Sequence, residues 1–396
     1  MADYGGWAPW IVRVNTVLCF ALQVAYLGVH DAGQWGTAMA LYIFSNITFW
    51  IAYVFFNALF PKVAADQPEA LHALEQKENG SITPKDYETR MQLVRSKIIN
   101  HSWGWNNVGF SSGAALTLGI LKGLHASDSV SLNNLGYSVC VAVMAGTSLV
   151  LSIPWFILEK RRPGASVPAG QNIVSHGLRQ VWRNMREAAK LSQTFFYLAL
   201  YFVLADGVAT LQTVVTIAQT RTVAFSAETN SLMLVAQGGS AGVFAFGAHW
   251  LQARLALRTK LLLHVSNFAC LALALWGVAG VWTARVGFHN LWEIWAFNAL
   301  YGVSLGTQWS YGQAFMAQLI PQGLENRFFS LLGIVSKGGG WIGPLVSSAV
   351  VDRSGNDWSA FGVVAALIGV PAVALFFVDE DKSRAECERY TADEKL

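Results

Sequence analysis

The amino-acid sequence predicts an all-α protein that crosses a membrane many times. Hydrophobic residues make up 54% of its 396 residues and charged residues only 13%, whereas a soluble domain carries roughly 25% charged residues. Most of its surface is therefore expected to face lipid. A spanning helix needs about 20 mainly apolar residues, and ten stretches have that character. They cover residues 8–29, 35–60, 106–124, 133–158, 193–218, 229–252, 260–284, 290–316, 327–352 and 357–378.

Two hydrophilic stretches interrupt these spans and divide the chain. Residues 61–105 mix both charge signs and are expected to form a cytoplasmic loop with a short amphipathic helix. Residues 159–192 are basic, and we expect a central cytoplasmic loop there. It separates a four-helix N-terminal half, residues 1–158, from a six-helix C-terminal half, residues 193–378. Residues 379–396 are acidic and are expected to form a disordered cytoplasmic tail.

The distribution of lysine and arginine predicts the orientation, because the cytoplasmic loops of membrane proteins carry an excess of both. Placing both termini in the cytoplasm puts nearly all of these residues in cytoplasmic segments. The opposite loops then hold only Arg221, Arg285 and Arg353. The sequence therefore predicts a multi-pass protein with both termini in the cytoplasm.

The order of the spans indicates a particular transporter fold. Six spans after a long basic cytoplasmic loop are typical of the C-terminal half of a major facilitator superfamily transporter, in which each half has six helices. The half before the loop has four predicted spans. On this interpretation the first two of the twelve helices are missing, and residues 8–29 form the third. A third helix starts on the cytoplasmic side, in agreement with the charge distribution.

Composition and motifs argue against other classes of protein. The net charge of +3 gives no case for nucleic-acid binding. The four cysteines are scattered without CxxC spacing, which predicts neither a disulfide framework nor a metal site. The sequence shows no histidine box and no Ser/His/Asp set. We therefore expect a protein that is not an enzyme and that uses no cofactor.

Two ionisable residues lie deep inside predicted spans. Asp206 falls in residues 193–218 and Lys337 in residues 327–352, at similar distances from the cytoplasmic ends of their spans. A charge at mid-bilayer costs at least about 2.5–3.5 kcal/mol, so it usually has a partner or a function. We predict an Asp206–Lys337 ion pair. Three interpretations stay open: a static link between helices, a carboxylate that couples transport to protons, and a lysine that extends to the membrane interface.

Lys337 stands beside a glycine-rich stretch. A phosphate-binding loop has the pattern GxxxxGK[ST] between a strand and a helix, whereas this lysine precedes the glycines within a helical span. Each glycine costs roughly 1 kcal/mol against alanine inside a helix. The stretch is therefore expected either to allow close helix packing or to kink the helix as part of a gate. The residues concerned are Gly338, Gly339, Gly340, Gly343 and Pro344.

Amide side chains within the predicted spans are candidates for lining a substrate path. Each one alone is more often a hydrogen bond between helices. Glu293 lies near the outer end of its span and is expected to reach water, and His264 is expected at the cytoplasmic interface. The amides are Asn57, Asn107, Gln212, Gln237, Asn298, Gln308 and Gln313.

Several motifs, taken in chain order, carry a family resemblance. They are Phe56-Asn57-Ala58-Leu59-Phe60-Pro61, Ser111-Ser112-Gly113, Ser152-Ile153-Pro154-Trp155-Phe156, Arg162-Pro163-Gly164, Asp206-Gly207 with Thr210, and Leu319-Ile320-Pro321-Gln322-Gly323-Leu324-Glu325-Asn326-Arg327-Phe328-Phe329 running on to Lys337, Trp341, Gly343 and Pro344. With this order and spacing the chain resembles the fungal vacuole effluxer family, autophagy-related protein twenty-two, within the major facilitator superfamily. The C-terminal motif is the most specific of the set.

The resemblance implies a permease of the vacuole membrane. In that family the cargo is neutral amino acids, mainly leucine, isoleucine and tyrosine, released by autophagic degradation during nitrogen starvation. The expected partners are therefore a small-molecule substrate, the lipid bilayer and, by our own inference from Asp206, protons. Two alternatives stay open: a major facilitator transporter of another small molecule, and a truncated relative that acts as a scaffold without transporting.

The sequence departs from the family pattern in two places. Family members begin with two further helices and the loop that follows them. The third span reads Ser111-Ser112-Gly113-Ala114-Ala115, where the family tends towards a lysine-glycine pair.

Overall fold

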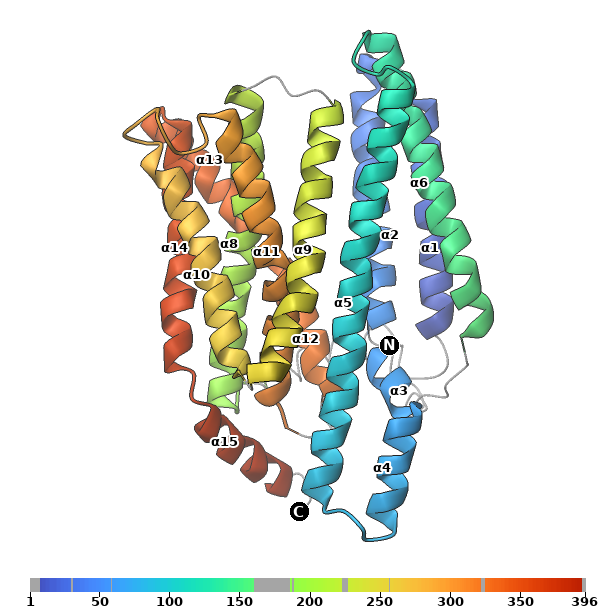
Figure 1. The fold of residues 1–396 in the computed structure, drawn as a ribbon, viewed down its shortest axis with the longest axis vertical. Helices are drawn as coiled ribbons and strands as arrows, with labels where there is room; N and C mark the ends of the chain where they lie inside the picture. Colours follow the sequence, from blue (N-terminus) through green and yellow to red (C-terminus); the bar gives the residue numbers. More distant parts are fainter. Residues whose placement is uncertain are drawn as a thin grey trace. The chain divides into compact units, whose positions relative to one another are not determined.

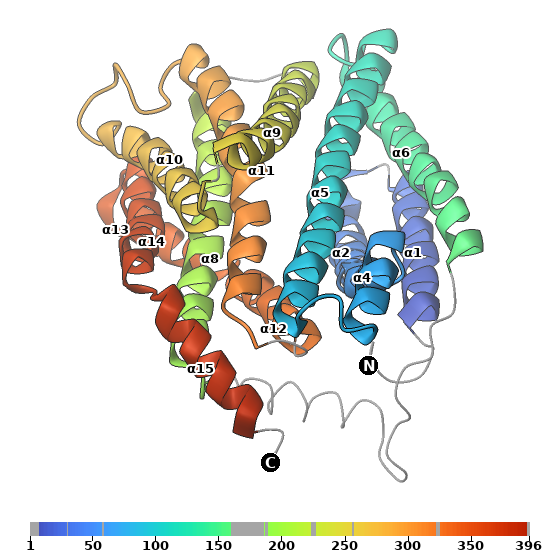
Figure 2. The same ribbon diagram turned by 60° about the horizontal axis from the view of Figure 1, so that its bottom comes forward.

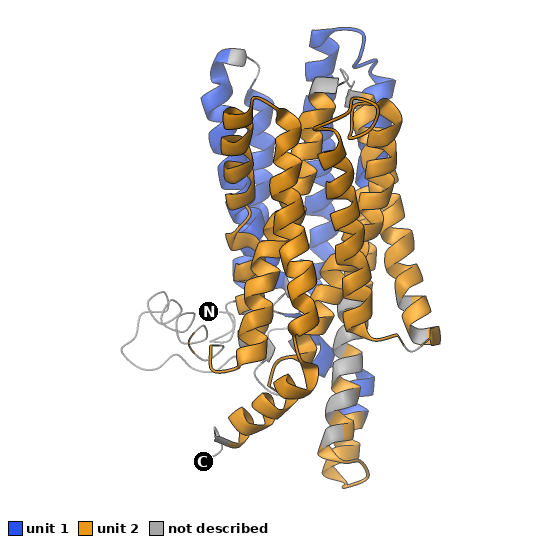
Figure 3. Cartoon of the chain, turned by 90° about the vertical axis from the view of Figure 1, so that its left-hand side faces the viewer, with its two compact units in different colours: residues 1–72, 113–182 blue, residues 73–112, 183–396 orange. Residues whose placement is uncertain are grey.

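The computed structural model describes residues 8–29, 31–57, 59–159, 186, 189–222, 227–255, 257–321 and 325–393. Every regular element in these ranges is a helix (Figure 1), as the sequence predicts. The chain divides into two compact units (Figure 3). One comprises Met1–His72 and Gly113–Trp182, and the other comprises Ala73–Ser112 and Arg183–Leu396. Most of the central loop predicted at residues 159–192 lies outside the described residues.

The first unit is built on three long helices, which are α1 (Ala8–Ala25), α2 (Trp35–Asn57) and α6 (Val130–Leu158). Helix α1 packs against both α2 and α6. The Arg13 guanidinium donates to the backbone carbonyl of Phe156 at 2.7 Å, which joins α1 to α6. Helix α6 begins at a side-chain cap, since the Ser129 hydroxyl accepts a hydrogen bond from the N–H of Leu132.

The hydrophilic stretch after α2 is more helical than predicted. It contains α3 (Phe60–Ala65), α4 (Pro68–Glu78) and the start of α5 (Pro84–Gly123). Helix α5 begins at Pro84 and not near residue 106 because Thr83 and Asp86 form a cap: Asp86 N–H donates to the Thr83 hydroxyl, and Asp86 Oδ2 accepts from Thr83 N–H. Proline suits the first helical position because its missing N–H would be unbonded there.

The second unit holds the C-terminal helices. They are α8 (Ser192–Thr222), α9 (Ala227–Leu255), α10 (Thr259–Ala279), α11 (Leu291–Gln318), α12 (Glu325–Gly338), α13 (Ile342–Ser354), α14 (Ala360–Ala374) and α15 (Glu380–Asp393). Helix α8 packs against α12, α13 and α14, while α11 packs against α9 and α10 (Figure 1). Glycines allow the closest approach: a Cβ at Gly302 or at Gly306 of α11 would collide with backbone carbonyls of α9.

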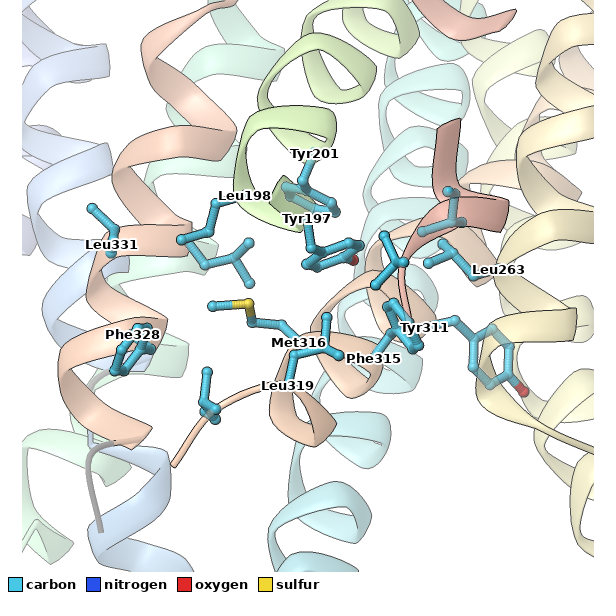
Figure 4. Packing of buried hydrophobic residues seen from close by; sticks show 14 of the residues in the cluster. Tyr197, Leu198, Tyr201, Leu263, Tyr311, Phe315, Met316, Leu319, Phe328 and Leu331 are labelled. Carbon is cyan, nitrogen blue, oxygen red and sulfur yellow. The ribbon is translucent and has the colours of Figure 1, made fainter. Parts of the chain in front are cut away.

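Aromatic and aliphatic side chains fill the core of this unit. At one end, Tyr197 and Tyr201 of α8 pack with Phe315 and Leu319 near the end of α11 (Figure 4). The buried Tyr197 hydroxyl donates to the carbonyl of Gly312 at 2.8 Å. Van der Waals packing of such large side chains holds helices together within a membrane, while the hydroxyl keeps its hydrogen bond.

The C-terminal tail was predicted to be disordered, and this prediction is wrong for residues 380–393. They form α15, which runs beside the start of α8 (Figure 2). Glu386 accepts from the Ser192 hydroxyl and from the Gln193 N–H. The Leu319 carbonyl accepts from the Ser383 hydroxyl and the Cys387 thiol. The acidic composition of this segment does not reveal that one face of α15 is hydrogen-bonded to the rest of the unit.

Seven helices within the described residues are long and apolar enough to cross a membrane. They correspond to seven of the ten predicted spans. The other three predicted spans coincide with α5, with α11 and with the pair α12 and α13. Large apolar side chains are exposed along many of these helices, as expected for surfaces that face lipid.

Candidate functional site: a carboxylate at a break between two helices

The predicted glycine-rich stretch separates two helices. Helix α12 ends at Gly338 and α13 begins at Ile342, so the predicted span at residues 327–352 is two helices with a short break between them. The first N–H groups of a helix have no partner within it, and α13 presents such groups at the break. Pro344 lies in this first turn, where its missing N–H is not needed. It is therefore part of a helix start and does not kink a continuous helix.

The Asp206 carboxylate lies at the start of α13. Its Oδ2 accepts a hydrogen bond from the backbone N–H of Gly343 at 2.8 Å. The side chain is buried, with 3% of its surface exposed. A negative group is stabilised at a helix N-terminus by the positive end of the helix dipole, and hydrogen bonds to an ionised acceptor are the strong ones. Asp206 is therefore held by the backbone of α13.

Glycine is required at position 343 for this contact. A Cβ there would collide with the Thr210 hydroxyl and would lie 3.1 Å from Asp206 Oδ2. Thr210 is fully buried, and its hydroxyl is fixed by donating to the carbonyl of Asp206 at 2.7 Å. Close packing is also found next to Asp206 on α8, since a Cβ at Gly207 would lie 2.9 Å from Leu367 Cβ of α14.

The second carboxylate oxygen of Asp206 is in a different environment. Oδ1 is buried and has no hydrogen-bond partner among the described residues. A buried carboxylate oxygen without a partner costs free energy, and protonation of the carboxyl group would lower that cost because it removes the charge. The contact between α8 and α13 therefore has three features: Asp206 Oδ2 is hydrogen-bonded, Oδ1 is buried without a partner among the described residues, and a helix break precedes α13.

Lys337 lies on the other side of the break, in the last turn of α12. Its Nζ lies 5.1 Å from the ring centroid of Trp309 on α11, a cation–π arrangement. On α8, the Asp206 carboxylate accepts its hydrogen bond from the backbone of α13. The predicted pairing stays a prediction.

The three glycines at the end of α12 and in the break differ in their surroundings. A Cβ at Gly339 would lie 3.0 Å from the Phe202 ring of α8, and a Cβ at Gly338 would lie 3.8 Å from it. At Gly340 the nearest atom would be the Lys337 carbonyl at 3.9 Å, an ordinary contact. Gly339 therefore permits close packing, whereas Gly340 has room for a side chain.

The structure brings one pair of the predicted path residues into contact. Gln237 Nε2 lies 3.4 Å from Gln212 Oε1 and joins α9 to α8. Asn107 and Asn298 each donate to a carbonyl of their own helix. Gln308 is buried, and its Oε1 has no partner among the described residues. The side chain of Asn57 lies outside the described ones.

Two further polar residues, Glu293 and His264, are buried. Glu293 was expected to reach water but is buried, because four donors bind its carboxylate: Trp276 Nε1, Gly287 N–H, and the N–H and side-chain amide of Asn290. The spacing Asn290-x-x-Glu293 is that of a capping box, a signal present in the sequence. His264 is buried within the protein and stacks on Phe376 with ring centroids 3.9 Å apart.

Sequence reasoning missed Asn267. It is fully buried on α10, and both polar atoms of its amide lack a partner among the described residues. The described part of the chain contains no cluster of three histidine, cysteine, aspartate or glutamate side chains able to hold a metal ion.

The chain is similar to a defined family. A family model described as "Vacuole effluxer Atg22 like" matches residues 1–388. "Autophagy-related protein 22" of Gibberella zeae is 27% identical over 315 residues, covering 74% of this chain and 47% of that protein. "Autophagy-related protein 22-1" of Phaeosphaeria nodorum is 32% identical over 263 residues, covering 60% of this chain and 46% of that protein. The protein of this name from Coccidioides immitis is 24% identical over 397 residues, covering 89% of this chain and 64% of that protein.

The chain thus spans less than two thirds of the length of each of these relatives. Among solved structures, the major facilitator superfamily transporter FucP in its outward conformation has a TM-score of 0.49 at 15% identity, covering 96% of this chain and 84% of that chain. A bacterial homologue of the human lysosomal transporter Spinster has a TM-score of 0.47 at 10% identity, covering 98% of this chain and 85% of that chain.

Proposed function

The chain belongs to the vacuole effluxer Atg22-like family, and from this premise we propose that it is a multi-pass transporter of the vacuole membrane. It moves neutral amino acids, leucine among them, from the vacuole lumen to the cytosol, and both of its termini face the cytosol. Transport is coupled to protons through Asp206. The family match and the apolar helices support the transporter role, and the geometry at Asp206 supports the coupling.

The observation that carries the coupling is the Asp206–Gly343 hydrogen bond, which joins α8 to the first turn of α13 directly after the helix break. A carboxylate at the start of α13 is stabilised by its charge, because the helix dipole attracts it. A proton on this group removes its charge, which abolishes that attraction and lowers the cost of burying Oδ1 without a partner. Protonation therefore weakens the joint between α8 and α13, and deprotonation restores it.

The direction of transport follows from the location of the protein. The vacuole lumen is acidic, so a carboxyl group that takes up a proton there and releases it in the cytosol moves the proton down its gradient. An amino acid that leaves with the proton is driven out of the vacuole. In this cycle the break between α12 and α13 is the segment that changes shape, since residues 339–341 lie between the two helices.

The test is leucine efflux from proteoliposomes that contain the purified chain and have an acidic interior. Asp206→Asn keeps the size of the side chain but cannot carry a proton between two charge states. We expect it to lower gradient-driven efflux about 100-fold, within the range usual for loss of a proton-transfer group. Leucine exchange without a pH gradient should stay within about two-fold, because exchange needs no net proton release.

The matched control is Asp128→Asn, the same chemical change at an exposed loop residue. It should leave both kinds of flux unchanged. Gradient-driven leucine efflux that survives Asp206→Asn would overturn the coupling. If wild-type protein moves other solutes but not leucine, the cargo belongs to another class, and if it moves none, the scaffold alternative holds.

A further inference from the structure

The first unit contains a cavity that plays no part in the proposal above. Its volume is about 400 Å³, and it lies between α1, α2 and α6. A cavity of this size is within the range of small-ligand sites, roughly 300–1,000 Å³. Its aromatic wall consists of Phe20, Phe49, Tyr53, Phe56, Trp155 and Phe156.

The lining residues of α1 follow the helix period. Val12, Thr16, Cys19 and Gln23 lie on one face because residues three or four apart stand above one another. The cavity therefore extends along about three turns of α1, which gives it an elongated shape.

The walls of the cavity are apolar in effect. Every lining residue is uncharged. Two of its hydroxyl groups already have partners within their own helices: the Thr16 hydroxyl donates to the Val12 carbonyl at 2.8 Å, and the Ser152 hydroxyl donates to the Ser148 carbonyl at 2.7 Å. A free amino acid needs an acceptor for its ammonium group and a donor for its carboxylate, and the walls offer no charged group for either. An apolar chain fits them better.

A cation lies at one end of the cavity. Arg13 follows Val12 on α1, and its guanidinium donates to the carbonyl of Phe156. Val12 and Phe156 both line the cavity, so Arg13 lies next to it. Its Nε is buried and has no hydrogen-bond partner among the described residues. The guanidinium also lies 5.4 Å from the Trp10 ring centroid. An arginine with a spare donor is well suited to a phosphate group.

We propose that the cavity holds one acyl chain of an anionic phospholipid, with the phosphate at Arg13. The elongated apolar space takes the chain, and the arginine takes the headgroup at the first turns of α1. The predicted orientation places this end of α1 at the cytoplasmic leaflet, which is the leaflet rich in anionic lipids. The inference does not depend on what the chain transports or on the role of Asp206.

The test uses the purified chain in nanodiscs that contain a phosphatidic acid with a photoreactive diazirine in its acyl chain. After illumination, labelled peptides are located by mass spectrometry. We expect labelling of the cavity residues of α1, α2 and α6, above the labelling of exposed faces. Ala52→Trp, which fills the cavity from α2, should lower this labelling about ten-fold, as expected for a blocked apolar site. Ser148→Phe, which fills it from α6, should do the same.

The matched control is Val54→Trp, a neighbouring position whose side chain is 43% exposed and does not line the cavity. It should leave the labelling unchanged. Arg13→Gln should lower labelling by the phosphatidic acid probe to the level given by a phosphatidylcholine probe with the same chain. Labelling that is equal on all exposed faces and unaffected by both filling variants would overturn the proposal. Displacement of the probe by millimolar leucine would also overturn it, in favour of a solute site.

Discussion

The carboxylate of Asp206 and the backbone N–H of Gly343 are joined by a 2.8 Å hydrogen bond, although 137 residues separate them in the chain. The bond connects the middle of α8 to the first turn of α13. It exists only because α13 starts anew after the glycines, which leaves an N–H group available. The position of one side chain thus depends on where another helix begins.

Gly343→Ala is expected to destabilise the second unit. The added Cβ collides with the Thr210 hydroxyl, and overpacking of a tight site costs about 1–3 kcal/mol. The apparent melting temperature of the detergent-solubilised protein should fall by several degrees. Gly340→Ala is the control, because its Cβ meets nothing closer than 3.9 Å and should leave the melting temperature within about one degree. Thr210→Ala should recover part of the loss, and no recovery would contradict the steric cause.

Glu293→Gln should also lower stability, for an electrostatic reason. The carboxylate accepts from four donors, whereas a glutamine turns its NH₂ group towards some of them. Leaving buried donors without an acceptor costs about 1–3 kcal/mol. The change should appear as a lower melting temperature by the same assay. Asp128→Asn, an exposed acid-to-amide change, should have no measurable effect, and equal effects of both would argue against the buried network.

Asp206 and Lys337 should behave as independent residues in the state described. Asp206→Asn and Lys337→Gln are combined in a double-mutant cycle of thermal stability. We expect a coupling energy below about 0.5 kcal/mol, because the partner of Asp206 is the Gly343 N–H. Lys337→Gln with Trp309→Leu should couple by about 0.5–1 kcal/mol through the cation–π contact. A coupling of several kcal/mol between Asp206 and Lys337 would establish the ion pair that the sequence predicts.

Cys387 on α15 should react slowly with thiol reagents. Burial raises the pKa of this thiol from 9.0 to about 11, with a smaller contribution from Glu386 and Glu388. Only the thiolate reacts, so a raised pKa lowers the rate at neutral pH. With the other three cysteines replaced by alanine, the rate should rise about ten-fold per pH unit from pH 7 to 10 without a plateau. A plateau near pH 9 would contradict burial of the thiol.

Weakening the attachment of α15 to α8 should make the Cys387 thiol more reactive. Glu386→Ala removes the hydrogen bonds to the Ser192 hydroxyl and the Gln193 N–H, so the thiol should react faster at every pH. Glu380→Ala, at the first residue of the same helix, removes an acidic side chain of the same type and should leave the rate unchanged.

The sequence predicts those features that depend on local pattern. The apolar runs predict the helices, and the position of Asp206 inside one of them marks it as a functional candidate. Its partner is not predictable in the same way, because a backbone N–H becomes available only where a helix breaks. The break itself depends on how Gly339 packs against Phe202 and Gly343 against Thr210. These are contacts between distant parts of the chain.

The predictions that the structure contradicts failed for similar reasons. The acidic tail suggested disorder because composition does not reveal that Ser383 and Cys387 lie on one face and reach the Leu319 carbonyl. Glu293 was assigned to water although the capping-box spacing with Asn290 was present in the sequence. The cavity between α1, α2 and α6 was not predicted, since empty space between helices leaves no pattern in any one of them.

The attachment of α15 also affects how the protein should be prepared. Removing residues 379–396 as an apparently dispensable acidic segment would uncover Leu319 and take away the hydrogen bonds that Glu386 makes to the start of α8. A purification tag or fluorescent reporter is better joined after Asp393, beyond the last residue of α15. Loss of this packing is expected to lower the yield of a shortened chain.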